Sequence, residues 1–260
     1  MRTWGRIGGA AALAVLIGWG AEVRADQAPL KSEVKPDAQL TGHEPWDPLE
    51  GFNRAMFWFN DRLLDRYVLG PVAKGWDWVA PDPVQRSVSR FFDHTTLPIV
   101  IVHDLLQGKP KVAASDFGRL LANTFMGGVG FLDPATDWGM PDHDEDCGQT
   151  LGVWGVPMGP YLMVPFWGPT SVRDGTGQLV DNAWVWFTPG FYTTAARMFW
   201  AVNDRSLVLR EVDEARAASL DFYSAVRHAY GERRARLIAD VEDTKVDNAE
   251  DLYFPEADVE

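Results

Sequence analysis

The sequence DPLEGFNRAMFWFNDRLLDRY, residues 47–67, decides the fold class. Asp47, Pro48 and Glu50 supply a cap acceptor, a proline at the first helical position and a carboxylate in the first turn, an arrangement typical of helix starts. At about 100° per residue, the regularly spaced apolar side chains fall within one arc of roughly 80°. These side chains are Leu49, Phe52, Met56, Phe59, Leu63 and Tyr67. The stretch therefore predicts one amphipathic helix over residues 48–67.

The charged half of this helix excludes a membrane-crossing position, because each charge costs about 2.5–3.5 kcal/mol near the centre of a bilayer. Two positions remain open: an ordinary core-facing helix, or a helix lying in a membrane interface. Aromatic residues at positions 57 and 58 widen the apolar surface beyond one packing stripe and favour the interface. The residues predicted to seat the protein in a membrane are Phe52, Met56, Phe57, Trp58 and Phe59.

Two asparagines interrupt the apolar half of the helix. Asn53 and Asn60 lie two turns apart and project on the same side as the apolar arc. They either bond neighbouring helices or line a wet interior.

Helix signals also dominate the rest of the chain. Further helix starts are indicated at residues 82–85, Pro98, Pro110 and 171–174, and Gly108 stands where a helix could end. Apolar spacing predicts the last helices over residues 191–203, 206–217 and 220–240. Extended structure is indicated only at residues 160–166, whose prolines exclude a central strand. We predict an all-α fold.

The two ends of the chain differ from its middle. Arg2 and Arg6 precede an uncharged apolar run that ends near Ala25, which is the pattern of a cleavable secretory signal. The predicted organisation is a signal peptide over residues 1–25, a flexible linker over 26–45, a helical domain over 46–241 and an acidic tail over 242–260.

Charge and composition restrict the partners. The chain carries a formal charge of −13, and removing residues 1–25 takes away three Arg and one Glu, which leaves 21 basic against 36 acidic residues and a charge of −15. Such a chain is a poor match for nucleic acid or for simple electrostatic docking to anionic lipid. The ten tryptophans that remain favour a hydrophobic attachment at a membrane–water interface.

Signatures of catalysis are scarce. The sequence holds no nucleophile elbow, phosphate loop or dinucleotide fingerprint, and no two of its five histidines show i, i+4 spacing. Cys147 is the single cysteine. The acidic residues 142–146 could ligate calcium or serve a hydrolase, but they fit better as caps for a helix entering residues 148–151. We predict no enzyme activity, no metal and no cofactor.

Glycine and proline are concentrated in residues 127–168, interleaved with aromatic residues. This stretch is either a set of rigid turns around a core or a layer of adjustable loops at a membrane boundary or pore mouth.

Several of these segments also resemble one family. The matching segments are residues 47–54, 104–108, 127–133, 148–152, 159–161 and 168–174. In this order, over residues 47–181, they resemble the MlaA/VacJ proteins.

The resemblance implies a helical ring seated in the inner leaflet of the bacterial outer membrane, next to trimeric porins. Its amphipathic channel returns phospholipids that have strayed into the outer leaflet and passes them to a soluble periplasmic carrier, without bond chemistry. The flexible element near the channel would be Gly127, Gly128, Gly130 and Phe131. Arg173 and Asp174 would contact headgroups at the channel mouth, or would belong to a capped helix start. Asn53 and Asn60 are the further candidates for the channel lining.

Two departures from the family pattern matter. Many members are lipoproteins, yet no cysteine lies near Ala25 and Cys147 is too deep in the chain to serve, so we expect a protein without a lipid anchor. His94 and His103 stand where asparagine is expected. Two rival functions remain: a porin-associated structural factor for envelope integrity or surface spreading, without transport of its own, and a soluble periplasmic hydrolase built on residues 142–146.

Overall fold

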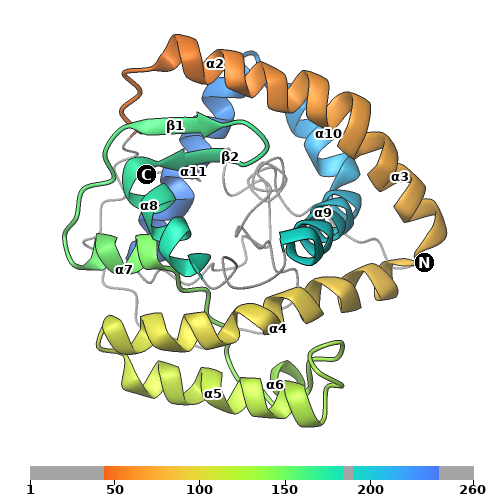
Figure 1. The fold of residues 1–260 in the computed structure, drawn as a ribbon, viewed down its shortest axis with the longest axis vertical. Helices are drawn as coiled ribbons and strands as arrows, with labels where there is room; N and C mark the ends of the chain where they lie inside the picture. Colours follow the sequence, from red (N-terminus) through yellow and green to blue (C-terminus); the bar gives the residue numbers. More distant parts are fainter. Residues whose placement is uncertain (1–43, 184–189, 240–260) are drawn as a thin grey trace, which may run out of the picture.

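The computed structural model describes residues 44–183 and 190–239, which form a ring of helices (Figure 1). One continuous helical path makes up one side of the ring: α2 (Glu50–Trp58), the π-helical η1 (Phe59–Leu69) and α3 (Gly70–Val79). On the opposite side runs α4 (Asp82–Leu106), with α5 (Pro110–Phe125) packed along its outer face. The predicted signal peptide, the acidic tail and nearly all of the linker lie outside the described residues.

The remaining elements complete the ring. They are α6 (Pro134–Asp137), α7 (Cys147–Val153), β1 (Tyr161–Val164), β2 (Gly168–Ser171), α8 (Val172–Asp181), α9 (Gly190–Leu207), α10 (Leu209–Ala218) and α11 (Phe222–Ile238). Figure 1 shows α7, α8 and the hairpin on the side opposite α3, and α9 inside the ring against α3 and α4. The helical ring predicted from the sequence is confirmed, with one antiparallel hairpin added to it.

Most predicted helix boundaries are close to the observed ones, but the start at Pro98 is wrong. Pro98 lies inside α4, which runs unbroken from Asp82 to Leu106. A proline inside a helix leaves the carbonyl four residues earlier, here at position 94, without its usual donor and weakens the adjoining turn. The hydroxyl groups of Thr95 and Thr96 donate to the carbonyls at positions 92 and 93 at 2.6 and 2.7 Å, which supplies local bonds where the ladder is weakened.

The apolar core is small. Its fully buried members are Tyr161 and Met163 from β1 together with Tyr223 and Val226 from α11. Phe57 packs edge-on against the rings of both Phe222 and Tyr223, with 5.6 Å between the ring centroids in each case. This core joins α2, the hairpin and α11 at one corner of the ring.

The rest of the interior is unusually polar. Arg119, Asp104 and Asn203 are completely or almost completely buried, whereas many large apolar side chains are exposed. In an ordinary soluble domain, charged residues are rarely buried unless they are paired. Among the described residues, no helix is both long enough and apolar enough to cross a bilayer.

Candidate functional site: an apolar ring with a basic pocket

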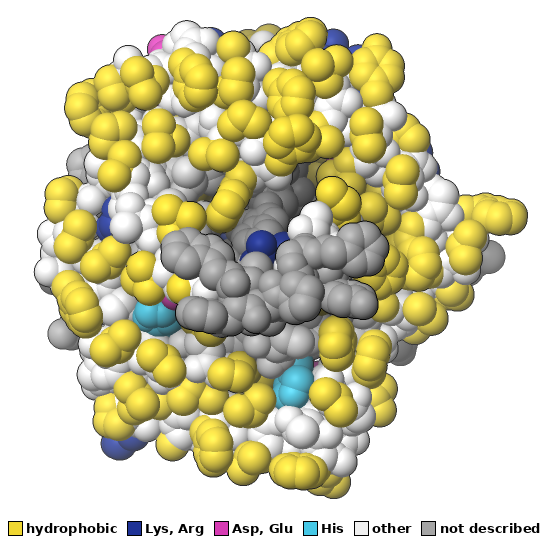
Figure 2. Space-filling view, viewed as in Figure 1, with side chains coloured by type: hydrophobic (Ala, Val, Ile, Leu, Met, Phe, Trp, Pro, Cys, Tyr) yellow, Lys and Arg dark blue, Asp and Glu magenta, His cyan; other side chains and the backbone are white. Residues whose placement is uncertain are grey.

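Apolar side chains surround a hollow at the centre of the ring. In the face that Figure 2 presents, they gather over nearly every element of the rim, and basic side-chain atoms are visible inside the hollow. The most exposed of the large apolar side chains, each at least half exposed, include Trp46, Phe52, Trp58, Tyr67, Trp78, Phe125 and Phe166. Exposed apolar surface of this extent marks a membrane or a partner protein.

The helix over residues 48–67 turns most of its apolar arc outward, although Met56 packs against the core. Leu49, Phe52 and Tyr67 are between 48% and 71% exposed, whereas Asp61 and Asp65 on the charged side are at most 6% exposed. These two carboxylates therefore face the protein interior, and most of the apolar arc faces the surroundings. This orientation is opposite to that of an ordinary core-facing helix.

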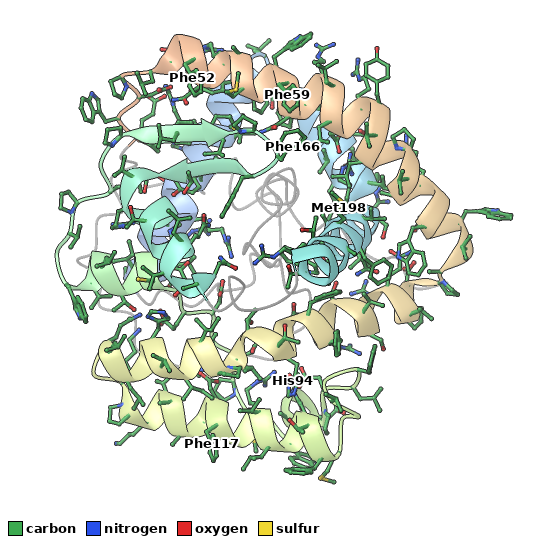
Figure 3. All side chains as sticks on the ribbon, in the orientation of Figure 1. Phe52, Phe59, His94, Phe117, Phe166 and Met198 are labelled. Carbon is green, nitrogen blue, oxygen red and sulfur yellow. The ribbon has the colours of Figure 1, made fainter. Side chains whose placement is uncertain are left out.

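The five residues predicted to seat the protein divide into two groups. Phe52 and Trp58 are more than half exposed, as that role requires. Phe59 stacks edge-on against Phe166 at the turn of the hairpin, with 5.1 Å between ring centroids (Figure 3). The prediction is corrected for Met56 and Phe57, which pack against the core because their side of the helix faces α11.

The structure also corrects the predicted channel role of Asn53 and Asn60, which bond a neighbouring strand. Asn53 donates to the carbonyl of Tyr161 at 3.0 Å and accepts from the amide of Met163 at 2.9 Å. Asn60 makes the equivalent pair of hydrogen bonds three residues further along the chain. It donates to the carbonyl of Val164 and accepts from the amide at position 166, both at 2.9 Å. The side-chain amides of Asn53 and Asn60 thus bond backbone groups on the edge of β1 that faces away from β2, as a neighbouring strand would.

A basic pocket of about 560 Å³ opens between η1, α3 and α10. Four cations line it, together with two carboxylates. The lining residues are Asp65, Arg66, Gly70, Pro71, Lys74, Arg205, Asp213, Arg216 and Ala217. Its volume is within the range of small-molecule sites.

Only part of the positive charge in this pocket is neutralised. The Asp65 carboxylate accepts from Arg205 at 2.7 Å and from Arg216 at 2.8 Å. Arg66 and Lys74 are exposed and make no ion pair with any residue that the structure describes. The pocket therefore offers two free cations to an anionic group such as a phosphate.

The sequence alone did not predict this pocket. Arg66 and Lys74 are eight residues apart, a spacing that on a regular α-helix would put them about 80° apart. That spacing was readable, but their convergence with Arg205 and Arg216 depends on the tertiary fold.

Arg173 and Asp174 lie inside a buried ion-pair cluster. The Asp174 carboxylate accepts from Arg173 at 2.8 Å, from Arg234 at 3.0 Å and from the hydroxyl of Tyr230 at 2.5 Å. Ser171 caps α8 by accepting from the amide of Asp174. The predicted headgroup contact is corrected, since both side chains are at most 7% exposed, and the capped helix start is what the structure shows.

The cluster fixes the crossing of α7 and α8. Burial opposes the ionisation of Asp146, but the Arg234 guanidinium outweighs burial and lowers the pKa of that carboxyl to about 2. Asp146 also caps α7 by accepting from the amide of Gln149, as predicted for the acidic residues before it. A Cβ on Gly177 would lie 2.5 Å from the backbone nitrogen of Gly148, so the two helices touch at glycines.

Known proteins resemble this chain in sequence. A family model described as MlaA lipoprotein matches residues 45–237. The chain belongs to the MlaA family. It is 36% identical over 203 residues to the intermembrane phospholipid transport system lipoprotein MlaA of Escherichia coli (strain K12), which covers 72% of this chain and 76% of that relative. The Haemophilus influenzae protein of the same description is 35% identical over 191 residues, which covers 71% and 76%.

A solved structure gives the same result for the fold. Described as the structural basis for maintenance of bacterial outer membrane lipid asymmetry, it matches this MlaA-family chain with a TM-score of 0.67 and 32% sequence identity. The match covers 74% of this chain and 98% of the solved one.

The relatives overturn one prediction. We expected a protein without a lipid anchor, but the MlaA family model and the curated relatives are described as lipoproteins. That expectation is wrong, because it rested only on the absence of a cysteine near Ala25, outside the described residues.

The glycine-rich loop of this MlaA-family chain is fastened rather than free. The amides of Val129 and Gly130 donate to the carbonyls at positions 124 and 123, at 3.1 and 2.9 Å. Phe131 stacks on Phe91, with 4.9 Å between ring centroids, and Gly128 has a positive φ of 63° that the tight turn requires. A Cβ on Gly127 would lie 2.4 Å from the carbonyl oxygen of Leu132.

The position of this loop also differs from the prediction. It follows α5, which Figure 1 shows on the outer side of α4, away from the ring centre. His94 points from α4 to this loop, and its ring lies against Gly130 (Figure 3). The loop therefore braces the outside of the ring, which corrects its assignment as a flexible element near the channel.

The acidic residues 142–146 are taken up by ion pairs. Asp142 pairs with Arg119 at 3.4 Å, Asp144 with Arg233 at 3.2 Å, and Glu145 with Lys109 at 2.8 Å. Asp146 pairs with Arg234 at 2.6 Å. Each of these four carboxylates therefore has a basic partner among the described residues.

Proposed function

We propose that this chain removes phospholipids from the outer leaflet of the outer membrane through the hollow of its ring and passes them to a soluble periplasmic carrier. The observation that carries the proposal is the inverted surface, with apolar side chains around a hollow in which basic side chains are visible, and with carboxylates and guanidinium groups buried within the protein (Figure 2). The relatives described as parts of an intermembrane phospholipid transport system support the same function.

The ring supplies the two chemistries that a phospholipid needs. Its apolar rim is a wall against which acyl chains can lie at little cost. The basic pocket has Arg66 and Lys74 available for the phosphate of the headgroup. A passive path of this kind lowers the barrier to movement but sets no direction, so direction comes from the carrier and its energy supply.

The proposal includes a porin trimer as a neighbour in the membrane, because large apolar side chains are exposed on many elements of the rim and can face lipid or a partner protein. It includes no covalent step and no cofactor. The carboxylates that a hydrolase would use are paired with arginine or lysine.

The test uses bacterial cells that lack their own family member and express this full chain. A membrane-impermeant amine reagent labels phosphatidylethanolamine in the outer leaflet, and we expect the chain to lower the labelling to that of wild-type cells. The double change Arg66→Glu with Lys74→Glu should abolish that effect. The control is Arg62→Glu, an exposed residue of η1 that does not line the pocket.

Each outcome decides between functions. If the pocket variant restores low labelling as well as the unaltered chain does, the basic pocket has no part in transport. If the unaltered chain restores resistance to detergents while labelling stays high, the protein is a structural envelope factor and the transport proposal fails.

A further inference from the structure

Three metal-ligand side chains from three elements meet near the junction of α4, α7 and α8. They are His103 near the end of α4, Cys147 at the start of α7 and Asp181 at the end of α8. One ligand atom of each lies within 4.8 Å of the other two. This group is separate from the basic pocket.

The outer partners of these side chains suit a metal site. The Thr150 hydroxyl lies 3.0 Å from His103 Nδ1 and 3.1 Å from the carbonyl of Asp146. When this hydroxyl donates to that carbonyl it accepts from Nδ1, so Nε2, which is hydrogen-bonded to Asp181 at 2.8 Å, is the ring nitrogen that can release its hydrogen and bind an ion. A metal-bound imidazole needs this arrangement, in which one ring nitrogen donates to an outer acceptor and the other binds the ion.

Asp181 and Cys147 are held in the same way. One oxygen of Asp181 accepts from the amide of Cys147 at 2.9 Å, while the other faces His103. The hydrogen bond fixes the carboxylate and places the thiol beside it. The side chains of His103 and Asp181 are 7% and 13% exposed, so water competes weakly at this site.

The charge around the thiol favours a cation over a catalytic role. The thiol of Cys147 is partly buried, and the carboxylates of Asp181 and Asp146 lie near it. These neighbouring charges are anionic, which disfavours a thiolate that has no cation beside it. A divalent cation would offset the same carboxylates and stabilise the thiolate as its ligand.

We propose that His103, Cys147 and Asp181 bind one Zn²⁺ ion, with water in the fourth position. Nitrogen, thiolate and carboxylate ligands are those that Zn²⁺ takes, at about 2.0–2.3 Å. In a tetrahedron with such bonds the ligand atoms lie roughly 3.3–3.8 Å apart. The hydrogen-bonded pair of His103 and Asp181 therefore opens by about half an ångström, and the thiol closes on the ion. The ion then ties the end of α4 to α7 and α8.

The ligands of this site are far apart in the sequence, so no sequence pattern predicts it. His103 and Asp181 are 78 residues apart, and Cys147 and Asp181 are 34 apart. A search for paired histidines on one helix cannot find it, because each ligand comes from a different element.

The test measures metal binding by the purified full-length protein after treatment with a chelator. We expect one Zn²⁺ per chain in equilibrium dialysis, and a Co²⁺ derivative with a thiolate-to-metal absorption band in the near ultraviolet. Cys147→Ser, which changes little in shape, should abolish the band and weaken Zn²⁺ binding at least tenfold. His103→Gln and Asp181→Asn should also weaken binding at least tenfold.

The matched control is His228→Gln, a histidine of α11 outside the cluster, which should bind as the unaltered chain does. Circular dichroism identifies any variant that fails to fold, and Cys147→Ser then carries the result. Stoichiometric binding that survives Cys147→Ser, or a Co²⁺ complex without the thiolate band, would overturn the proposal. So would the absence of Zn²⁺ binding at micromolar concentrations. None of these results bears on phospholipid transport, which does not depend on the ion.

Discussion

The asparagines at positions 53 and 60 show how single residues hold this ring together. Seven helical residues rise about 10.5 Å, and three residues of a strand rise about 10 Å. The two side chains therefore meet equivalent points along β1 and satisfy backbone groups that no further strand pairs. A helix thus docks on a strand edge without a sheet between them.

Asn53→Ala should lower the free energy of unfolding by about 2–3 kcal/mol, because it leaves a buried carbonyl and a buried amide of β1 without partners. Chemical unfolding in detergent measures the change. Arg62→Ala on the adjoining η1 is the control, because this residue is exposed and its ion pair contributes little. Equal stability of the two variants would show that the strand edge does not need the asparagine.

Asp104 is a second residue whose burial has a measurable consequence. It is completely buried, and burial together with the neighbouring Asp116 carboxylate raises its pKa to about 7. In the unfolded chain the pKa of an aspartate is 3.8. Between about pH 4 and pH 7 the folded state therefore holds one proton more than the unfolded state, and stability falls as pH rises through that window.

Asp104→Asn should remove this dependence, since an amide keeps a donor toward Asp116 and never ionises. Relative to the unaltered chain, the variant should gain stability between pH 4 and pH 8, by about 1.4 kcal/mol for each unit of the pKa difference. Melting temperatures across that range test it, with the exposed Asp137→Asn as control. A parallel pH profile for the variant and the unaltered chain would contradict the account of Asp104.

At the scale of residues, the sequence predicted which positions are unusual but not always their partners. The polar positions 53 and 60 stood out because they interrupt an apolar arc. Phe57 did not stand out from Trp58, although one faces the core and the other faces outward. Adjacent aromatic residues differ only in their direction around the helix, and that direction is fixed by α11, which is far away in the chain.

At the scale of elements, the crossing of α7 and α8 depends on glycines. Gly177→Ala should destabilise the protein by about 1–3 kcal/mol, because its Cβ meets backbone atoms of α7 at 2.5–3.0 Å that cannot move without separating the helices. Thermal unfolding measures it. Gly175→Ala, on the same helix, meets only the Thr170 side chain at 3.4 Å and should change stability by less than about 1 kcal/mol. Equal losses for the two variants would contradict the close crossing.

The elements were predictable where local chemistry sets their limits. Gly108 ends α4 with a positive φ of 79°, and Pro110 begins α5, as the sequence indicated. The proline at position 98 misled the prediction, because its effect is overridden by packing of α4 against α5 and α9 along its length. The hairpin partner of β1 was missed, since residues 168–171 carry glycine and proline rather than strand formers.

At the scale of the whole molecule, exposed apolar side chains should contribute to membrane binding and packed ones to folding stability. Trp78 is 88% exposed, whereas the neighbouring Trp76 donates to Asn203 at 3.0 Å and lies edge-on against Phe199. Trp78→Ser should lower affinity for phosphatidylcholine vesicles roughly tenfold and change stability by less than about 0.5 kcal/mol.

The matched variant Trp76→Ser should do the opposite, with a loss of stability of about 3 kcal/mol and little change in vesicle affinity of the folded protein. Flotation of vesicles measures the first quantity and chemical unfolding the second. If Trp78→Ser binds vesicles as tightly as the unaltered chain, this part of the apolar rim does not contact lipid.

The overall ring could be predicted because six short segments match a known family in order, and the family fixes the fold. The site could not be predicted to the same depth. Its basic pocket joins residues 65–74 to residues 205–217, and its hollow exists only once the ring closes. Charges that look like headgroup ligands in the sequence, as at 173 and 174, are structural ion pairs once α11 packs against α8.

The central claim, a membrane-seated ring that carries phospholipid, is tested most directly by the location and the lipid content of the protein. The full-length chain is expressed in a Gram-negative host, the outer membrane is separated from the soluble periplasm, and the purified protein is extracted for lipid analysis by mass spectrometry. The account predicts recovery in the outer membrane with bound phospholipid, and loss of that lipid in the double variant Arg66→Glu with Lys74→Glu. Recovery as a soluble, lipid-free protein would contradict it.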